Sequence, residues 1–249
     1  MDSNVTRRLA LQNRSRKLTA FLQARLSPEG YLGLSLTLGL LVLIGATWLF
    51  AAIAEDVVTS DPITIIDVRF SAWLQTHANP TVTTLMLVIT NSHSTLPVAM
   101  VTLAILIYLW FRRLRHRALT LALAVYGGAL LNFLLKNLFL RPRPHFSTPI
   151  LTLTGYGFPS GHTMGATVFY GTLCAFTVSR VRNWPLRVLA IIVSLVMIAL
   201  VGFSRIYLGA HYLSDVLGAM AEGLAWLALC FTAVGTIRRR RESRRVRTS

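Results

Sequence analysis

Three short segments of the sequence gather basic residues, histidines and one carboxylate, which are residue types that can bind and cleave a phosphate. The segments contain Lys136 and Arg143, then Pro159, Ser160, Gly161 and His162, and finally Ser204, Arg205, His211 and Asp215. All three lie beside long apolar runs, where a charge is costly unless an anion neutralises it. Arginine offers a planar fork for phosphate oxygens, and lysine offers a point charge. The pattern therefore predicts a phosphate site built on Lys136, Arg143 and Arg205.

The second segment, Pro-Ser-Gly-His at 159–162, is typical of a helix N-terminus. Free backbone N–H groups and the positive end of the helix dipole favour anions at such a position. Gly161 has no side chain to hinder a close approach of the ligand. We expect this segment to complete the phosphate site.

The two histidines add the means to react with a bound phosphate, because imidazole acts as a nucleophile or as an acid and base near neutral pH. Asp215 lies four residues after His211, so on one helical face it can accept a hydrogen bond from one ring nitrogen. The other nitrogen is then free to attack phosphorus. The pattern predicts His211 as the nucleophile, Asp215 as its orienting partner and His162 as the general acid.

Taken together, the three segments resemble the signature of the type 2 phosphatidic acid phosphatase superfamily, in order and without a departure. The resemblance covers residues 30–237. It implies a helical membrane bundle whose active site faces the periplasm or the lumen. It implies hydrolysis of a phosphate ester or anhydride through a phosphohistidine, without a metal or cofactor. The implied roles are phosphate binding by Lys136, Arg143, Ser160, Gly161 and Arg205, protonation of the leaving group by His162, attack by His211 and orientation by Asp215.

The composition of the chain independently indicates a membrane protein. Hydrophobic residues make up 54% and charged residues only 14%, whereas soluble domains carry about 25% charged residues. The formal net charge of +16 would suggest a nucleic-acid partner in a soluble protein. With this apolar excess, the basic residues are better explained by a bilayer, and no nucleic-acid partner is expected. Cys174 and Cys230 both lie in apolar runs and predict neither a disulfide nor a zinc site.

Six apolar runs are long enough to cross a membrane. They cover residues 31–54, 96–111, 118–138, 162–178, 186–203 and 212–237. The second run could begin near Thr81, but polar residues at 91–94 and Pro97 interrupt it, so we expect a kink or break there. The fold class predicted is therefore all-α, a bundle of six transmembrane helices.

Basic residues fall on one side of this arrangement. Twenty of the 25 Lys and Arg lie in the tails or in the loops on the side of the termini. Short cytoplasmic loops collect such residues, so both termini are expected in the cytoplasm and the motifs at the periplasmic face of a bacterial inner membrane. The domains predicted are a basic N-terminal tail at 1–30, a six-span phosphatase domain at 31–237 and a basic C-terminal tail at 238–249.

Two further segments have the pattern of interfacial helices. In the N-terminal tail, Leu18, Phe21, Leu22 and Leu26 form an apolar stripe beside basic residues, which suits either an anionic leaflet surface or a solvated tail. Residues 61–77 begin with Asp-Pro, a helix start, and repeat apolar residues at helical spacing. We expect this second segment on the outer face.

Several charged residues allow more than one interpretation. Arg141 forms an earlier Arg-Pro pair, but the spacing of the signature selects Arg143, so Arg141 is expected at the rim. His93 fits a structural histidine at a helix break better than a residue of the substrate entrance. Glu222 fits a buried interhelical hydrogen bond better than a proton relay. His162, His211 and Asp215 could form a metal set, but three cations nearby would repel a divalent ion.

These observations favour a membrane phosphatase that acts on a lipid phosphate or diphosphate. Undecaprenyl diphosphate is the first choice of substrate, followed by phosphatidic acid and phosphatidylglycerol phosphate. A lipid phosphotransferase, in which an acceptor lipid replaces water, is the second hypothesis. A non-enzymatic lipid transporter is the third, although it would not require His211 beside Asp215 and three cations.

Overall fold

The computed structural model describes residues 33–60, 62–146, 149–151 and 153–248, and within them all regular structure is helical, as the sequence predicts. The predicted stripe in the N-terminal tail lies outside the described residues. The elements are α2 (Leu34–Thr59), α3 (Pro62–Thr76), α4 (Pro80–Ser92), α5 (Thr95–Phe111), α6 (Arg115–Ala122), a π-helical turn η1 (Leu123–Gly127), α7 (Gly128–Phe139), α8 (Gly161–Arg180), α9 (Trp184–Tyr207) and α10 (Leu213–Thr248).

The described residues of the six predicted apolar runs lie mainly on these helices, but the helices differ in how apolar they are. By length and composition, four described helices can cross a membrane: α2, the continuous α6–η1–α7 segment, α9 and α10. The pair α4 and α5 makes a fifth if the two are one bent span. Helix α8 has 20 residues but is not among these candidates, so the number of six spans stays a prediction.

The predicted break in the second run is confirmed. Helices α4 and α5 meet at an angle of 47°, and His93 lies between them. The His93 ring bonds through Nδ1 to the carbonyl oxygen of Ile89 at 2.8 Å and through Nε2 to the hydroxyl of Tyr170 at 2.6 Å. Both ring nitrogens therefore have partners within the fold, which supports the structural interpretation of this histidine.

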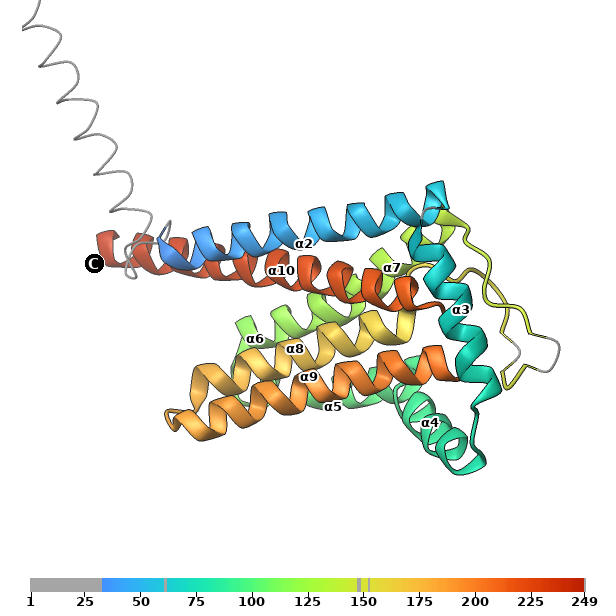
Figure 1. Cartoon of the computed structure of the whole chain (residues 1–249). Coiled ribbons are helices and arrows are strands. Elements are labelled where there is room, and N and C mark those ends of the chain that lie inside the picture. Colours follow the sequence, from blue (N-terminus) through green and yellow to red (C-terminus); the bar gives the residue numbers. More distant parts are fainter. Residues whose placement is uncertain (1–32, 61, 147–148, 152, 249) are drawn as a thin grey trace, which may run out of the picture.

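The long helices run side by side, and α3 crosses one end of the bundle (Figure 1). Helix α10 packs along α2 and α8, and α8 packs along α9. Helix α10 continues without interruption to Thr248, past residue 237 where the predicted span ends. The segments that carry the three motifs, at the ends of α7 and α9 and at the starts of α8 and α10, meet at the end covered by α3.

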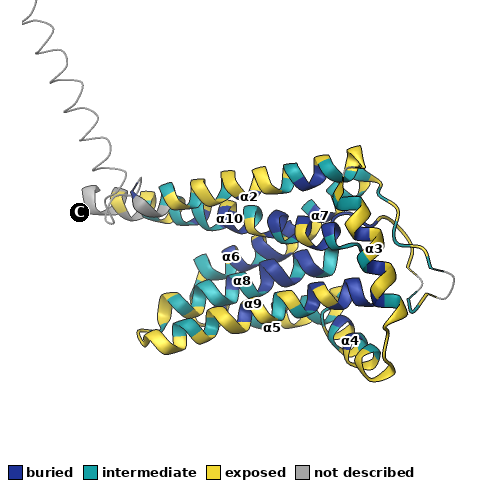
Figure 2. Ribbon diagram, viewed as in Figure 1, coloured by how far each residue is buried: buried dark blue, intermediate teal, exposed yellow. Residues whose placement is uncertain are grey.

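Burial is concentrated along α8, along the inner part of α10 and at the end near α3 (Figure 2). One cluster joins α6–η1, α8 and α10 through Leu121, Val168 and Ala219. Helices α2 and α9 instead expose large side chains such as Trp48 and Leu195. A wide exposed apolar surface of this kind is expected where hydrocarbon chains surround a protein.

Helix α3 turns its polar side inward. Asp67, Ser71 and Leu74 are buried, and their spacing of four and three residues places them on one helical face. Ile66 and Trp73, by contrast, are each more than half exposed. Ile66 and Trp73 therefore face outward, whereas Leu74 packs into the protein together with the carboxylate of Asp67.

Candidate active site

His211 is placed by the turn that ends α9. Gly209 has a φ of +69°, its N–H bonds to the carbonyl of Ile206 at 3.0 Å, and the N–H of Ala210 bonds to the carbonyl of Arg205 at 3.0 Å. This pair of bonds is a Schellman motif, for which a glycine in the left-handed region is the usual residue. The turn fixes His211 directly beside the end of the helix that carries Arg205.

Asp215 reaches His211 through the cap of α10. The helix begins at Leu213, so the prediction that His211 and Asp215 share a helical face is wrong: His211 precedes the helix. The Asp215 Oδ2 atom instead accepts the backbone N–H of Tyr212 at 3.0 Å, as in a capping box, and lies 3.3 Å from Nδ1 of His211. The spacing of four residues works because a carboxylate in the first turn reaches back over the helix start.

The contacts of the His211 ring determine its tautomer. Nη1 of Arg143 lies 3.2 Å from Nε2 of His211, and a guanidinium only donates. Nε2 must therefore carry the lone pair, and Nδ1 carries the proton that points to Asp215. Arg143 itself is held by the carbonyl oxygens of Gly155 at 3.1 Å and Ala210 at 2.9 Å.

The surroundings of His211 favour a neutral imidazole. Its side chain is fully buried. Burial and the charges of Arg205 and Arg143 lower the pKa of the His211 imidazole to about 4, although the hydrogen bond and charge of Asp215 act in the opposite direction. At neutral pH the ring is therefore uncharged, and Nε2 carries the lone pair that a nucleophile needs. In this structure that lone pair accepts the hydrogen bond from Arg143.

The N-terminus of α8 lies against the same carboxylate-bearing turn. The Ser160 N–H donates to the backbone carbonyl of Asp215 at 3.1 Å, and the Ser160 side chain makes no capping bond to α8. The preceding Phe158 is fully buried and stacks on Phe50 with ring centres 5.7 Å apart. Burying such a ring is worth roughly 1.5–3 kcal/mol, which anchors the loop that leads into α8.

Gly161 allows a close approach of α8 to α7. A Cβ at this position would lie 3.2 Å from Oδ1 of Asn132 and 3.8 Å from Cε of Lys136. The Lys136 ammonium donates to the carbonyl of Tyr156 at 3.2 Å. The first turn of α8 and the Lys136 side chain are therefore neighbours, as the predicted phosphate site requires.

Arg205 and His162 complete the set. The Arg205 guanidinium is buried; its Nη1 donates to the hydroxyl of Thr90 at 2.5 Å, while its Nε has no hydrogen-bond partner among the described residues. His162 lies in the first turn of α8, where the charges of Arg205 and Lys136 act on its ring. The structure thus brings all the predicted site residues to one end of the bundle.

The prediction for Arg141 is wrong. It was expected at the rim, but its side chain is only 10% exposed and forms ion pairs with Asp67 at 2.8 Å and Asp215 at 2.5 Å. Glu222, by contrast, makes the interhelical hydrogen bond that was predicted for it: its Oε2 accepts from the side chain of Asn132 of α7 at 2.9 Å.

Sequence reasoning missed Asp67 and Thr90. Asp67 could have been noticed in the sequence, because it is an isolated acidic residue in the apolar run Ile-Thr-Ile-Ile-Asp-Val. Thr90 could not have been identified from the sequence, because a threonine near a helix break does not predict a contact with Arg205, which is 115 residues away.

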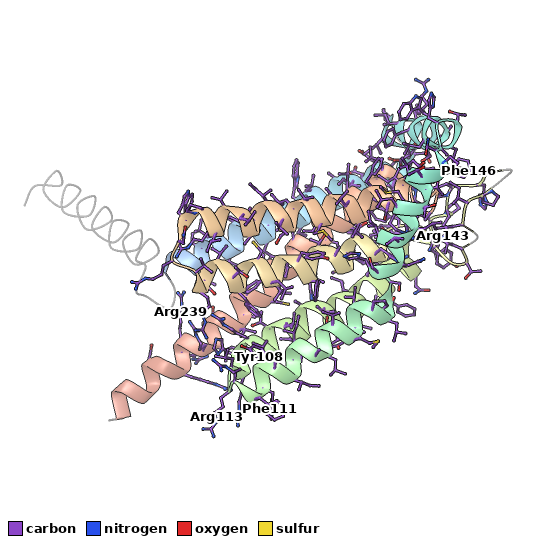
Figure 3. The ribbon with its side chains drawn as sticks, turned by 90° about the horizontal axis from the view of Figure 1, so that it is seen from below. Tyr108, Phe111, Arg113, Arg143, Phe146 and Arg239 are labelled. Atoms are coloured by element: carbon purple, nitrogen blue, oxygen red, sulfur yellow. The ribbon has the colours of Figure 1, made fainter. Side chains whose placement is uncertain are left out.

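The basic residues at the two ends of the bundle are well separated (Figure 3). Arg143 and Phe146 lie at the end that carries the site, whereas Arg113 and Arg239 lie at the opposite end together with Tyr108 and Phe111. Arg143 of the first motif thus lies at the end of the bundle opposite to Arg113 and Arg239.

Comparison with known proteins gives a family for this architecture. Residues 117–239, which contain all three motifs, match the model of the PAP2 superfamily. Phosphatidylglycerophosphatase B of Bacillus subtilis (strain 168) is 38% identical over 109 residues, which are 42% of this chain and 52% of that protein. Undecaprenyl-diphosphatase BcrC of the same organism is 29% identical over 152 residues, 59% of this chain and 72% of that protein.

A solved structure shares the fold. The crystal structure of a transmembrane PAP2-type phosphatidylglycerolphosphate phosphatase from Bacillus subtilis superimposes with a TM-score of 0.68 at 27% identity, covering 76% of this chain and 93% of that one. The relatives are named phosphatases, in agreement with the enzyme class predicted from the motifs. The family predicted from the same motifs is confirmed for this part of the chain: residues 117–239 match the PAP2 superfamily.

Proposed function

We propose that this chain is a membrane phosphatase that hydrolyses a lipid phosphate or diphosphate through a phosphohistidine at His211. The observation that carries the proposal is the setting of the imidazole: Nδ1 faces Asp215 at 3.3 Å, and Nε2 faces Arg143 at 3.2 Å. A neutral nucleophile is thereby directed at the place where a cation would hold a phosphate. Positioning and charge stabilisation of this kind supply most of the catalysis in phosphoryl transfer.

In the first step the Nε2 lone pair of His211 attacks phosphorus, and the bond from phosphorus to the leaving oxygen breaks. His162 gives its proton to that oxygen. Lys136, Arg143, Arg205 and the N-terminus of α8 at Ser160 and Gly161 hold the phosphoryl oxygens and stabilise the developing charge. The phosphate anion offsets the surrounding cations, which favours the protonated form of His162 in the complex.

In the second step water attacks the phosphohistidine. The His162 imidazole, now neutral, takes a proton from that water, and the bond from phosphorus to His211 Nε2 breaks. Inorganic phosphate leaves, and both histidines return to their starting forms. Asp215 holds the Nδ1 proton of His211 throughout and stabilises the charge that the ring gains on phosphorylation.

A lipid substrate suits the position of the site at one end of a bundle with an apolar outer surface. The head group can enter between the motifs while the tail stays in the bilayer. Undecaprenyl diphosphate is our first choice of substrate, ahead of phosphatidylglycerol phosphate and phosphatidic acid. Similarity to proteins named undecaprenyl-diphosphatase BcrC and phosphatidylglycerophosphatase B supports the first two.

For the membrane arrangement we propose six spans, with α8 as the fourth, and a phosphatase domain at 31–237 between two basic tails. Helix α8 is packed between its neighbours α9 and α10, which suits a more polar helix inside a bundle. Both termini then lie in the cytoplasm of a bacterium, and the site faces the periplasm.

The test is phosphate release by the purified protein from undecaprenyl diphosphate, phosphatidylglycerol phosphate and phosphatidic acid in mixed micelles. The His211→Gln variant is the inactive control. The His145→Gln variant is the matched control, because His145 is exposed. We expect release by the wild type and by His145→Gln only, and no release from any of the three lipids would contradict the proposal.

A second arm separates hydrolysis from transfer. The same reaction is run with and without an excess of a lipid that carries a free hydroxyl, and the phosphorylated lipid is quantified beside free phosphate. Hydrolysis predicts the same phosphate release in both reactions. Phosphate that appears on the acceptor, with release falling in proportion, would assign a phosphotransferase instead.

A further inference from the structure

We propose that Arg141, held by Asp67, is a positioning residue that orients the Asp215 carboxylate toward His211. The inference rests on the proposed function, since it assigns a role to a residue behind the catalytic pair. It starts from the ion pairs that Arg141 makes with Asp67 of α3 and Asp215 of α10. Arg141 itself lies in the loop after α7, so three separate segments meet at its guanidinium.

The contacts on Arg141 use both ends of its fork. Nη2 lies 2.8 Å from Oδ2 of Asp67, and Nη1 lies 2.5 Å from Oδ1 of Asp215 and 2.6 Å from the hydroxyl of Ser214. The carbon of the guanidinium lies 4.8 Å from the centre of the Tyr212 ring. Arg141 is thus enclosed by two carboxylates, a hydroxyl and an aromatic face.

Asp67 is fixed as firmly as Arg141. It is fully buried, its Oδ1 accepts the backbone N–H of Ser214 at 2.9 Å, and its Oδ2 also accepts the Ser214 hydroxyl. Two buried carboxylates without a cation between them would repel each other strongly, and removal of one partner of a buried ion pair is costly. Asp67 therefore determines where Arg141 can lie.

The bond to Arg141 gives the two carboxylate oxygens of Asp215 different partners. Arg141 engages Oδ1, which leaves Oδ2 for Nδ1 of His211 and the N–H of Tyr212. Rotation of the carboxylate would exchange these oxygens, and the bond to Arg141 opposes it. A carboxylate that is held in this way fixes the tautomer and orientation of the imidazole.

Arg141 and Arg143 therefore have different tasks, although they are two residues apart. Arg143 faces Nε2 of His211, the side on which a phosphate would be attacked. Arg141 faces Asp215 on the other side of the ring. Its charge is also stabilised there: burial alone would lower the pKa of the Arg141 guanidinium, but Asp215 and Asp67 outweigh that effect and raise it.

The test compares Arg141→Lys and Asp67→Asn with the wild type. Lysine keeps the charge but has no fork that spans both carboxylates, and asparagine keeps the shape of Asp67 without its charge. We expect kcat to fall about 10- to 100-fold in each variant, with KM for the lipid changed less than about threefold, since phosphate contacts persist. Arg143→Lys should instead raise KM.

A second readout needs no turnover. In ¹⁵N-histidine NMR spectra, the His211 signals are those lost in His211→Gln, and their titration gives the pKa of the ring. Removal of a cation that neutralises Asp215 should raise that pKa in Arg141→Gln. Arg69→Lys is the matched control, because Arg69 lies on α3 and is exposed; it should leave the pKa, kcat and KM unchanged.

The outcomes separate the two proposals. An unshifted His211 pKa in Arg141→Gln, or a loss of activity in Arg141→Lys and Asp67→Asn that merely follows the fraction of folded protein, would overturn the positioning role. If Arg141→Gln does not fold, the kcat and KM values of the other two variants decide. If the wild type releases no phosphate from any lipid, the proposed function fails, and the titration still tests whether Arg141 controls the Asp215–His211 pair.

Discussion

Arg143 donates a hydrogen bond to Nε2 of His211 at 3.2 Å, and this contact identifies the nitrogen that carries the lone pair. Because the Nδ1 side is taken by Asp215, one edge of the ring lies toward a carboxylate and the other toward the Arg143 guanidinium, to which we assign phosphate binding. The predictions below depend on this asymmetry.

Replacement of His211 and replacement of His162 should impair activity in different ways. His211→Ala should abolish turnover and leave no phosphoenzyme, because the attacking nitrogen is missing. His162→Ala should regain activity in part with p-nitrophenyl phosphate, whose leaving group departs without a proton. Incorporation of ³²P after a rapid quench without acid checks both. A phosphoenzyme that persists in His211→Ala and disappears in His162→Ala would reverse the roles.

Asp215→Asn should keep lipid binding but lose roughly 10²- to 10⁴-fold in kcat, because an amide does not hold the same imidazole tautomer. Steady-state kinetics on one lipid substrate, with binding of a non-hydrolysable analogue measured separately, distinguish the two effects. A rate within tenfold of the wild type would show that the carboxylate is dispensable.

Acid should destabilise the protein through His211. The unfolded chain protonates this ring at its ordinary pKa of 6.5, but the folded protein does so at about 4. Proton uptake therefore favours the unfolded chain as pH falls from 6.5 toward 4, and the loss levels off below that at about 3 kcal/mol. Thermal unfolding in micelles should depend less on pH in His211→Gln. Equal dependence in both proteins would contradict the buried neutral ring.

Activity should survive EDTA, because Lys136, Arg143 and Arg205 supply the positive charge that a metal would provide. Vanadate, which mimics five-coordinate phosphorus, should inhibit. Phosphate release with and without EDTA is the measurement. If EDTA abolishes the activity and zinc or magnesium restores it, the metal-free mechanism is wrong.

The orientation in the membrane is tested with reporters. A fusion at the C-terminus should behave as cytoplasmic and an insertion at Gly155 as external, because 20 of the 25 basic residues are predicted on the side of the termini. Residue 155 lies in the loop between α7 and α8, beside Arg143. A cytoplasmic signal from that insertion would place the site on the other face.

The sequence was sufficient for the features that depend on neighbouring residues. Apolar runs predicted the helices, and polar residues at 91–94 predicted the break between α4 and α5. The motifs predicted the family and the residues that meet at one end of the bundle. The helices, the break and each single motif follow from periodicity and from groups only a few residues apart. The meeting of the motifs at one end follows from the order of the apolar runs, which puts them on the same side.

Only the tertiary structure decided which charges meet. Arg141 and Asp67 are 74 residues apart, and Arg205 and Thr90 are 115 residues apart, so no local pattern relates them. The contact of His211 with Asp215 was predicted, but its geometry was not, because it depends on where α10 begins and on the cap that Asp215 forms. Whether a buried charge binds a ligand or another side chain is determined by how separate helices pack, since the high cost of an unpaired charge can be relieved by either partner.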